Sequence, residues 1–163
     1  MRVIGIDPGS VTTGYGVVEK VRDGLALVDQ GCIRTKRGEP FASRLDTIFT
    51  GLEAVLARTN PTHAAIEAPF AGKNVKSLIQ LAHARGVAML ALRRAGLEVE
   101  EYAPRTVKSQ VVGYGGAEKQ QVAKMVQLLL KGARDLKLQS DAADALAVAI
   151  CHAHMAAFQA KTR

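Results

Sequence analysis

The chain has 163 residues, of which 48% are hydrophobic, and this length and composition suit one globular domain with a core of its own. No apolar run is long enough to span a bilayer, and Asp7 interrupts the short apolar run after Arg2, so we expect neither a membrane span nor a signal peptide. The two cysteines, Cys32 and Cys151, fit neither a zinc spacing nor a disulfide framework, which favours a cytoplasmic location. The formal net charge of +7 favours a nucleic-acid partner, although charge alone does not separate this from a merely basic surface.

The first third of the chain has the composition of β-strands. We predict strands at residues 2–7, 14–20 and 25–35, because these runs are rich in β-branched and apolar residues. Turn residues separate them at 8–10 (Pro-Gly-Ser) and at 23–24, where Asp-Gly is a common hairpin dipeptide. The beginning of the chain therefore reads as three consecutive strands.

Helices and strands alternate through the rest of the chain. The predicted elements are an amphipathic helix with apolar residues from Leu45 to Leu56 that ends at Asn60-Pro61, a strand at 63–70, a long helix at 74–95, a strand at 97–104, and helices at 117–131 and 140–158. Three strands followed by this alternation predict an α/β fold, with a mixed five-stranded sheet flanked by helices on both faces. We expect one domain over residues 1–163.

The helix expected at 74–95 is apolar on two sides. One stripe contains Val75, Leu78, Ile79, Ala82 and Met89, and the other contains Leu81, Ala84, Ala88 and Leu92. A helix with two apolar stripes is covered on two sides, either inside its own domain or by a second copy of the chain. A domain of this size has limited room to enclose a helix, so the pattern favours a dimer interface.

Acidic residues stand in largely apolar surroundings at several points of the sequence. Asp7 and Glu67 each end an apolar strand, and neighbouring strands would bring the two carboxylates together. Asp141 and Asp144 are three residues apart and share one face of the first turn of the last helix. For Asp141 alone, the favoured interpretation is a first-turn acid that complements the helix dipole after the N-cap Ser140. Asp144 lies in a segment that otherwise reads as buried.

Four acids gathered in apolar surroundings repel one another, and a divalent cation is the usual remedy. Ligation by oxygen alone suits Mg²⁺ or Mn²⁺ better than Zn²⁺. One such ion, or a pair, can activate water and stabilise an in-line displacement at phosphorus. The sequence is therefore compatible with metal-dependent chemistry on a phosphodiester, which the surrounding lysine and arginine side chains would attract.

Other candidate residues have two interpretations each. Lys108 and Lys119 lie on either side of the glycine-rich stretch 113–116, and they are either phosphate contacts or solvated surface charges. Phe70 precedes the long helix, where it either packs against the start of that helix or stacks on an unpaired base. The residue types alone leave both pairs of alternatives open.

Several motifs, in their order and spacing, resemble the RuvC family of Holliday-junction resolvases from residue 2 to about residue 160. They are GIDPGSVTTGYGV, GCIRT, SRL, AIEAPF followed by KN, ARGVA, VKSQVVGYGGAEKQQV and DAADALAVAICH. The resemblance implies a ribonuclease H-like fold, a homodimer formed around residues 74–95, and a branch-migration motor complex as a partner. It also implies paired nicking of four-way junction DNA that depends on Mg²⁺ or Mn²⁺, with two ions per active site.

The resemblance also assigns roles to individual residues. It places the catalytic and metal-binding acids at Asp7, Glu67, Asp141 and Asp144, and the DNA-binding residues at Phe70, Lys73, Asn74, Lys108 and Lys119. Two alternatives remain from the residues themselves: a branched-DNA-binding module without activity, and an ATPase fragment of the actin and sugar-kinase type. The second would need another nucleotide-binding lobe, for which the chain is short.

Overall fold

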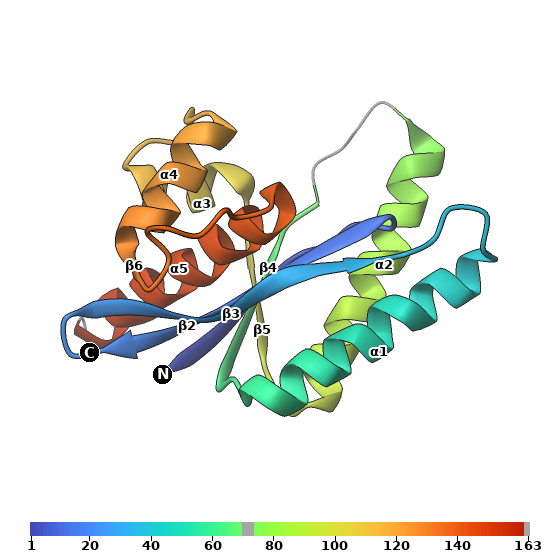
Figure 1. The fold of residues 1–163 in the computed structure, drawn as a ribbon, viewed down its shortest axis with the longest axis horizontal. Helices are drawn as coiled ribbons and strands as arrows, with labels where there is room; N and C mark the ends of the chain where they lie inside the picture. The colour runs from blue at the N-terminus through green and yellow to red at the C-terminus, as the bar shows by residue number, and fades with distance from the viewer. Residues whose placement is uncertain (70–73, 162–163) are drawn as a thin grey trace.

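The computed structural model describes residues 1–69 and 74–161, with side chains described as far as residue 158. Its centre is a six-stranded sheet in the order β5-β4-β1-β2-β3-β6 (Figure 1). The strands are β1 (Arg2–Asp7), β2 (Thr12–Val21), β3 (Gly24–Arg34), β4 (His63–Glu67), β5 (Val99–Tyr102) and β6 (Leu130–Lys131). Strands β1 to β3 are antiparallel, whereas β4 runs parallel to β1, β5 to β4 and β6 to β3, so the sheet is mixed.

Helices cover both faces of the sheet, which confirms the expected fold class (Figure 1). The helices are α1 (Phe41–Thr59), α2 (Val75–Arg94), α3 (Pro104–Val112), α4 (Lys119–Leu129) and α5 (Ser140–Lys161). Helices α1 and α2 pack on one face, while α5 lies on the other face beneath α3 and α4. In the part of the chain that is described, no helix is both long enough and apolar enough to cross a membrane.

Helix α3 corrects the sequence analysis. The predicted strand at 97–104 is too long, because β5 ends at Tyr102 and a helix begins at Pro104. Proline suits the first turn of a helix, where its missing N–H would have no intrahelical partner. Val107 and Val111 form the buried side of this helix, at the expected spacing of four residues.

A short sixth strand is the second difference. The sequence predicts a helix through residue 131, but α4 ends at Leu129 and Leu130 has an extended backbone. Leu130 and Lys131 pair with Leu25 and Ala26 of β3. The helix gives way here because this backbone can hydrogen-bond to the open edge of β3, while the Leu130 side chain enters the core.

Helix α2 buries one of its two apolar stripes. Ala84, Ala88 and Leu92 are buried against the core that α1 shares, whereas Val75 and Ile79 of the other stripe are exposed. A single copy of the chain therefore covers only the Ala84, Ala88 and Leu92 side of this helix. The expected dimer interface would cover the other side.

Glycines allow α5 to lie directly on the sheet. Gly5 of β1 is opposite Gly16 of β2, and Asp7 is opposite Gly14. A Cβ atom added at Gly14 would lie 2.0 Å from the carbonyl oxygen of Asp141, and one added at Gly5 would lie 2.2 Å from that of Ala145. The backbone of α5 thus occupies the space that a side chain at Gly5 or Gly14 would fill. This contact fixes the first turn of α5 beside the end of β1.

Replacing Gly14 with alanine, which adds a Cβ atom, tests this close contact. We expect Gly14→Ala to lower the free energy of unfolding by about 2–4 kcal/mol, because the new Cβ meets backbone atoms that cannot rotate away. Urea unfolding measures the change. The control is Gly116→Ala, whose Cβ would lie 3.9 Å from its nearest neighbour and should leave stability nearly unchanged. Equal stability of the two variants would contradict the close contact.

Candidate active site

Two of the predicted acids lie side by side at the ends of parallel strands. In the register of β1 and β4, Ile6 is opposite Ile66, so the next residues, Asp7 and Glu67, are neighbours. Ile6 and Ile66 belong to the core under α1 and α2. Because side chains alternate along a strand, Asp7 and Glu67 point to the opposite face, where α5 packs.

The acids meet α3, α4 and α5 around one cavity of about 300 Å³. Its charged lining residues are Asp7, Glu67, Lys108, Lys119 and Asp144, and its remaining walls are Pro104, Val107, Val122 and Ala147. Three carboxylates and two ammonium groups from five different elements therefore face a single space. Every one of these charged residues is a site residue predicted from the sequence.

The cavity raises the pKa of the two carboxyl groups at the strand ends, Asp7 and Glu67. Burial, and then the nearby negative charges of Glu67 and Asp144, raise the pKa of Asp7 to about 7. The pKa of Glu67 is raised by burial first and by Asp144 second. With a pKa near 7, Asp7 is only partly ionised at neutral pH, and a bound cation would favour its charged form.

Lysines offset part of this repulsion. Lys119 Nζ donates to Asp144 Oδ2 at 2.9 Å, and this hydrogen bond is the main cause of the raised pKa of Lys119. The charge of Lys119 lowers the pKa of both Asp7 and Glu67, and Lys108 acts on Glu67 in the same direction. Lys119 begins α4, whose N-terminus is held by reciprocal hydrogen bonds between Glu118 and Gln121, so its place at the cavity is well defined.

Asp141 lies just outside the cavity. Its carbonyl oxygen rests on Gly14, and its negative charge contributes to the raised pKa of Asp7. It occupies the first turn of α5, where an acid complements the helix dipole. Both interpretations of Asp141, as a helix-start acid and as a member of the acidic cluster, are therefore compatible with its position.

The predicted DNA-binding residues at the start of α2 are only partly visible. Asn74 is the N-cap of α2, and its side-chain oxygen accepts a hydrogen bond from the Ser77 backbone N–H at 3.1 Å. Phe70 and Lys73 lie outside the described residues. Their proposed roles on DNA are untested by the structure.

The sequence analysis missed the apolar walls of the cavity. Pro104 and Val107 come from α3, the helix that was not predicted, and Val122 comes from the inner side of α4. The available signal was Pro104 followed by valines four residues apart at Val107 and Val111. These side chains exclude water from one side of the acids, which is the burial that raises their pKa values.

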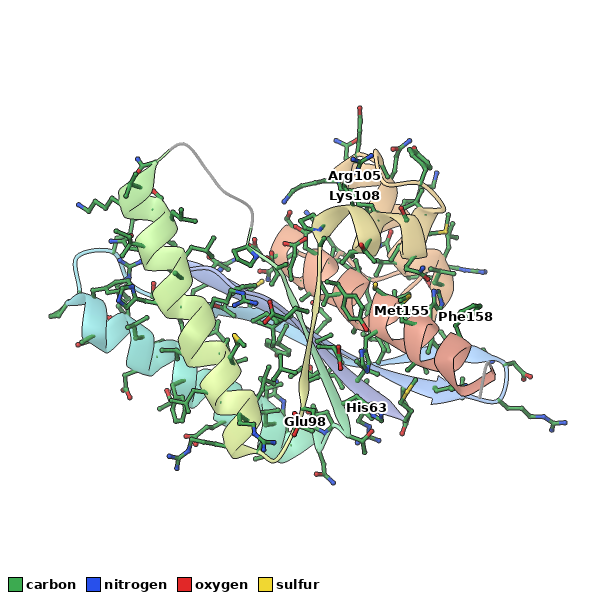
Figure 2. All side chains as sticks on the ribbon, turned by 180° about the vertical axis from the view of Figure 1, so that it is seen from behind. His63, Glu98, Arg105, Lys108, Met155 and Phe158 are labelled. Carbon is green, nitrogen blue, oxygen red and sulfur yellow. The ribbon has the colours of Figure 1, made fainter. Side chains whose placement is uncertain are left out.

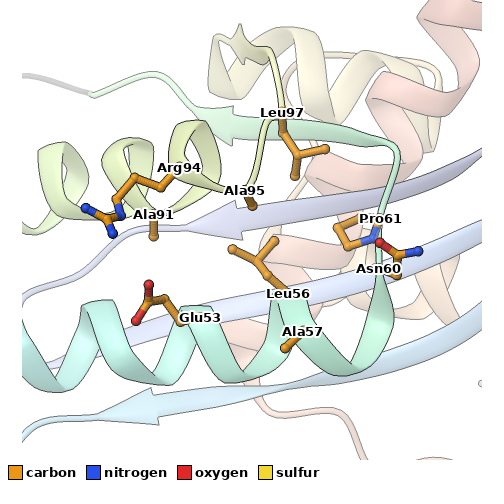
Figure 3. Close-up of a pocket in the computed structure, with 9 residues that line it drawn as sticks. All are labelled: Glu53, Leu56, Ala57, Asn60, Pro61, Ala91, Arg94, Ala95 and Leu97. Carbon is orange, nitrogen blue, oxygen red and sulfur yellow. The ribbon is translucent and has the colours of Figure 1, made fainter.

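A larger cavity lies elsewhere, between the C-terminal ends of α1 and α2 (Figure 3). It has a volume of about 400 Å³, and its charged lining residues are Glu53 and Arg94. Leu56, Ala91 and Leu97 make its walls largely apolar. None of the predicted site residues lines it, so the smaller cavity at the strand ends is the candidate active site.

The donor atoms at the candidate site suit a hard divalent cation, because all are carboxylate oxygens. The raised pKa of Asp7, caused first by burial and then by the charges of Glu67 and Asp144, also favours a cation. However, no three acid, histidine or cysteine side chains within residues 1–69 and 74–158 are arranged to hold one metal ion. A metal therefore fits the chemistry of the donors, and its binding requires these side chains to move closer together.

The strand order and the acids at the strand ends define a ribonuclease H-like fold. The sequence profile described as "Crossover junction endodeoxyribonuclease RuvC" matches residues 3–152. The chain belongs to this RuvC family, as the sequence motifs indicated, and family membership favours the nuclease interpretation over the ATPase alternative.

Relatives and solved structures agree with this assignment. The RuvC of Syntrophotalea carbinolica is 53% identical over 154 residues, covering 94% of each chain. That of Chloroflexus aggregans is 50% identical over 156 residues, covering 96% of this chain and 94% of the relative. The Thermus thermophilus RuvC structure in complex with Holliday junction substrate superposes with a TM-score of 0.88 at 34% identity, covering 98% of this chain and 96% of that one.

Burial of Asp7 predicts a pH-dependent effect on stability. Its pKa is 3.8 in its ordinary state and about 7 in the folded protein. Between these values the folded protein keeps a proton that the unfolded chain loses, so the contribution of Asp7 to stability falls as the pH rises and is lost above about pH 7.

Asp7→Asn removes this dependence, so we expect its melting temperature in chelator to exceed that of the parent protein at about pH 8 by about 2 °C or more. Near pH 4 the two proteins should melt at similar temperatures. Asp46→Asn, on the exposed side of α1, is the control and should differ little from the parent at either pH. A variant that is destabilised equally at both pH values would contradict a buried, repelled carboxyl group at position 7.

Proposed function

We propose that this protein is a metal-dependent endonuclease that resolves Holliday junctions by paired, symmetric nicks in DNA recombination and repair. The observation that carries the proposal is the cavity at the strand ends, where three carboxylates and two lysines face one another. Family membership supports the same activity, as does the relative whose structure was solved with a Holliday junction substrate.

The acids would hold Mg²⁺ or Mn²⁺, which all-oxygen ligand sets suit, with two ions per site expected from the resemblance. The proposed ligands are Asp7, Glu67, Asp141 and Asp144. When bound, such an ion supplies charge stabilisation at phosphorus and lowers the pKa of a coordinated water. Asp7 must lose its proton to act as a ligand, and its pKa near 7 makes this a pH-dependent step.

Lysines and arginines would bring the phosphodiester to the acids. Lys108 and Lys119 line the cavity itself. Figure 2 shows Arg105 and Lys108 on α3 at one end of the sheet, with His63, the first residue of β4, near the other end. Since Glu67 ends β4, the basic residues lie at the end of the sheet that carries the acids. Phe70, Lys73 and Asn74 complete the proposed DNA surface.

The exposed stripe of α2 would form a homodimer interface. Together with Leu45 of α1, it borders a shallow hollow of about 430 Å³ whose other lining residues are Ala82, His83, Gly86, Val87 and Leu90. A twofold axis through this surface would present two equivalent sites to two equivalent strands, which accounts for symmetric nicking. The branch-migration motor complex and the cytoplasmic location stay predictions from the sequence.

Cleavage of a synthetic four-way junction tests the proposed activity. With Mg²⁺ or Mn²⁺ the parent protein should nick two strands symmetrically and leave a linear duplex intact. We expect Asp144→Asn to reduce the cleavage rate on the order of a hundredfold, because it removes a ligand charge, while junction binding persists. Glu53→Gln, at the remote cavity, is the matched control and should cut at the parental rate. A parent protein that binds the junction but never cuts it would favour the binding-module alternative.

A charge on α2 tests the interface. Leu90 of α2 and Leu128 of α4 are each 54% exposed, so the same substitution at either site meets a similar environment in the single chain. We expect Leu90→Glu to shift the protein towards a monomer in light scattering coupled to size exclusion, because it would bury a charge in the interface. Leu128→Glu should leave the mass unchanged. A parent protein that is already monomeric at high concentration would contradict the proposed dimer.

A further inference from the structure

The turn that follows Asp7 is held by buried hydroxyl groups. Thr13 is fully buried, and its Oγ1 donates to the Gly9 carbonyl at 2.8 Å and accepts from the Gly9 N–H at 3.3 Å. Thr35, directly after β3, donates its backbone N–H to the Val11 carbonyl at 3.0 Å. Its Oγ1 donates to the Ser10 carbonyl at 2.9 Å. The backbone just after Asp7 is therefore fixed from both sides.

Arg44 of α1 converges on the same turn. Its Nη2 donates to the Ser10 carbonyl at 2.5 Å, and its Nε donates to Thr35 Oγ1 at 3.1 Å. A guanidinium group offers several donors in one plane, so a single side chain can bind both acceptors at once. Arg44 thus links α1 to the turn that carries the chain away from Asp7.

Arg85 of α2 reaches the end of the neighbouring strand. Its side chain is 14% exposed and forms an ion pair with Glu101 of β5. Its Nε lies 3.5 Å from the carbonyl oxygen of Glu67, and the side chain borders a small cavity together with Asp7 and Glu67. Because a buried guanidinium needs a partner, the pair with Glu101 holds Arg85 beneath the end of β4.

These contacts share one geometry. The side chains of Asp7 and Glu67 point to the face of the sheet that α5 covers, whereas the two arginines come from α1 and α2 on the opposite face. Each arginine contacts a backbone carbonyl at or just beyond an acid. We propose that Arg44 and Arg85 are positioning residues, which fix the strand ends so that the two carboxylates are aimed correctly for junction cleavage. This inference rests on the proposed function.

The arginines act on the backbone, so their loss should affect the rate of the chemical step and leave junction affinity alone. Small displacements of a catalytic group reduce rates strongly, even where binding is unchanged. A direct phosphate contact would behave differently, because its loss lowers affinity and the salt dependence of binding.

The test is single-turnover cleavage at saturating protein, together with the dissociation constant of the junction measured in chelator. For Arg44→Gln and Arg85→Gln we expect the rate to fall about tenfold to a hundredfold, with affinity within about twofold of the parent. Thr35→Val should lower the rate in the same way, while Thr35→Ser, which keeps the hydroxyl group, should retain it. Arg93→Gln is the control, since Arg93 pairs with Glu98 at the exposed far end of α2.

Folded Arg44→Gln and Arg85→Gln proteins that cut at the parental rate would overturn the inference. A loss of affinity with a smaller salt dependence would also overturn it, and would make the arginines phosphate contacts. If Arg44→Gln fails to fold, the two Thr35 variants test the turn after Asp7, and equal cleavage rates for Thr35→Val and the parent would overturn the inference there. If Arg85→Gln fails to fold, Glu101→Gln tests Arg85 in its place, and a parental cleavage rate would overturn the inference there. A parent protein that does not cut the junction at all would instead overturn the proposed function.

Discussion

The contact between the backbone of α5 and the glycines of β1 and β2 is the constraint on which the site depends. A side chain at Gly14 would overlap the carbonyl of Asp141, and one at Gly5 would overlap that of Ala145. Gly14 is opposite Asp7 and Gly5 is two residues before it on β1, so the helix lies close to the strands where the acid emerges. A helix at the usual distance of a packed layer would place Asp144 farther from Asp7.

The clustered carboxylates lower the stability of the folded protein, but their position suits the proposed metal-dependent cleavage. Carboxylates in a partly apolar cavity repel one another, and the raised pKa of Asp7 reports the cost of ionising it there. The surrounding fold holds the acids in place through groups on the other face, including Arg44, whose guanidinium also lies 5.4 Å from the centre of the Phe41 ring. Phe41 in turn meets His83 of α2 at a ring separation of 5.7 Å. The proposed dimer surface and the turn after Asp7 are thus joined by consecutive side-chain contacts.

The sequence predicted the fold class and all the charged residues that line the cavity, because strand ends and helix starts carry strong local signals. Asp7 and Glu67 stood out as acids that end apolar strands, and the structure places them side by side. The strand predicted at 97–104 exists as β5, but its predicted end was wrong, because Pro104 instead begins α3. The roles of Arg44 and Arg85 could not be predicted, because their partners are backbone carbonyls brought near by the fold, and neighbours in sequence do not reveal them.

We expect α5, packed on the glycines of β1 and β2, to complete one cation site with the ends of β1 and β4. Anomalous diffraction from crystals of the protein grown with Mn²⁺ tests this site directly, because it locates the ion without reference to activity. We expect a Mn²⁺ peak between the carboxylates of Asp7 and Asp144, with Lys119 displaced from its hydrogen bond to Asp144. An ion bound at some other place, or no ion at a saturating Mn²⁺ concentration above the pKa of Asp7, would contradict it.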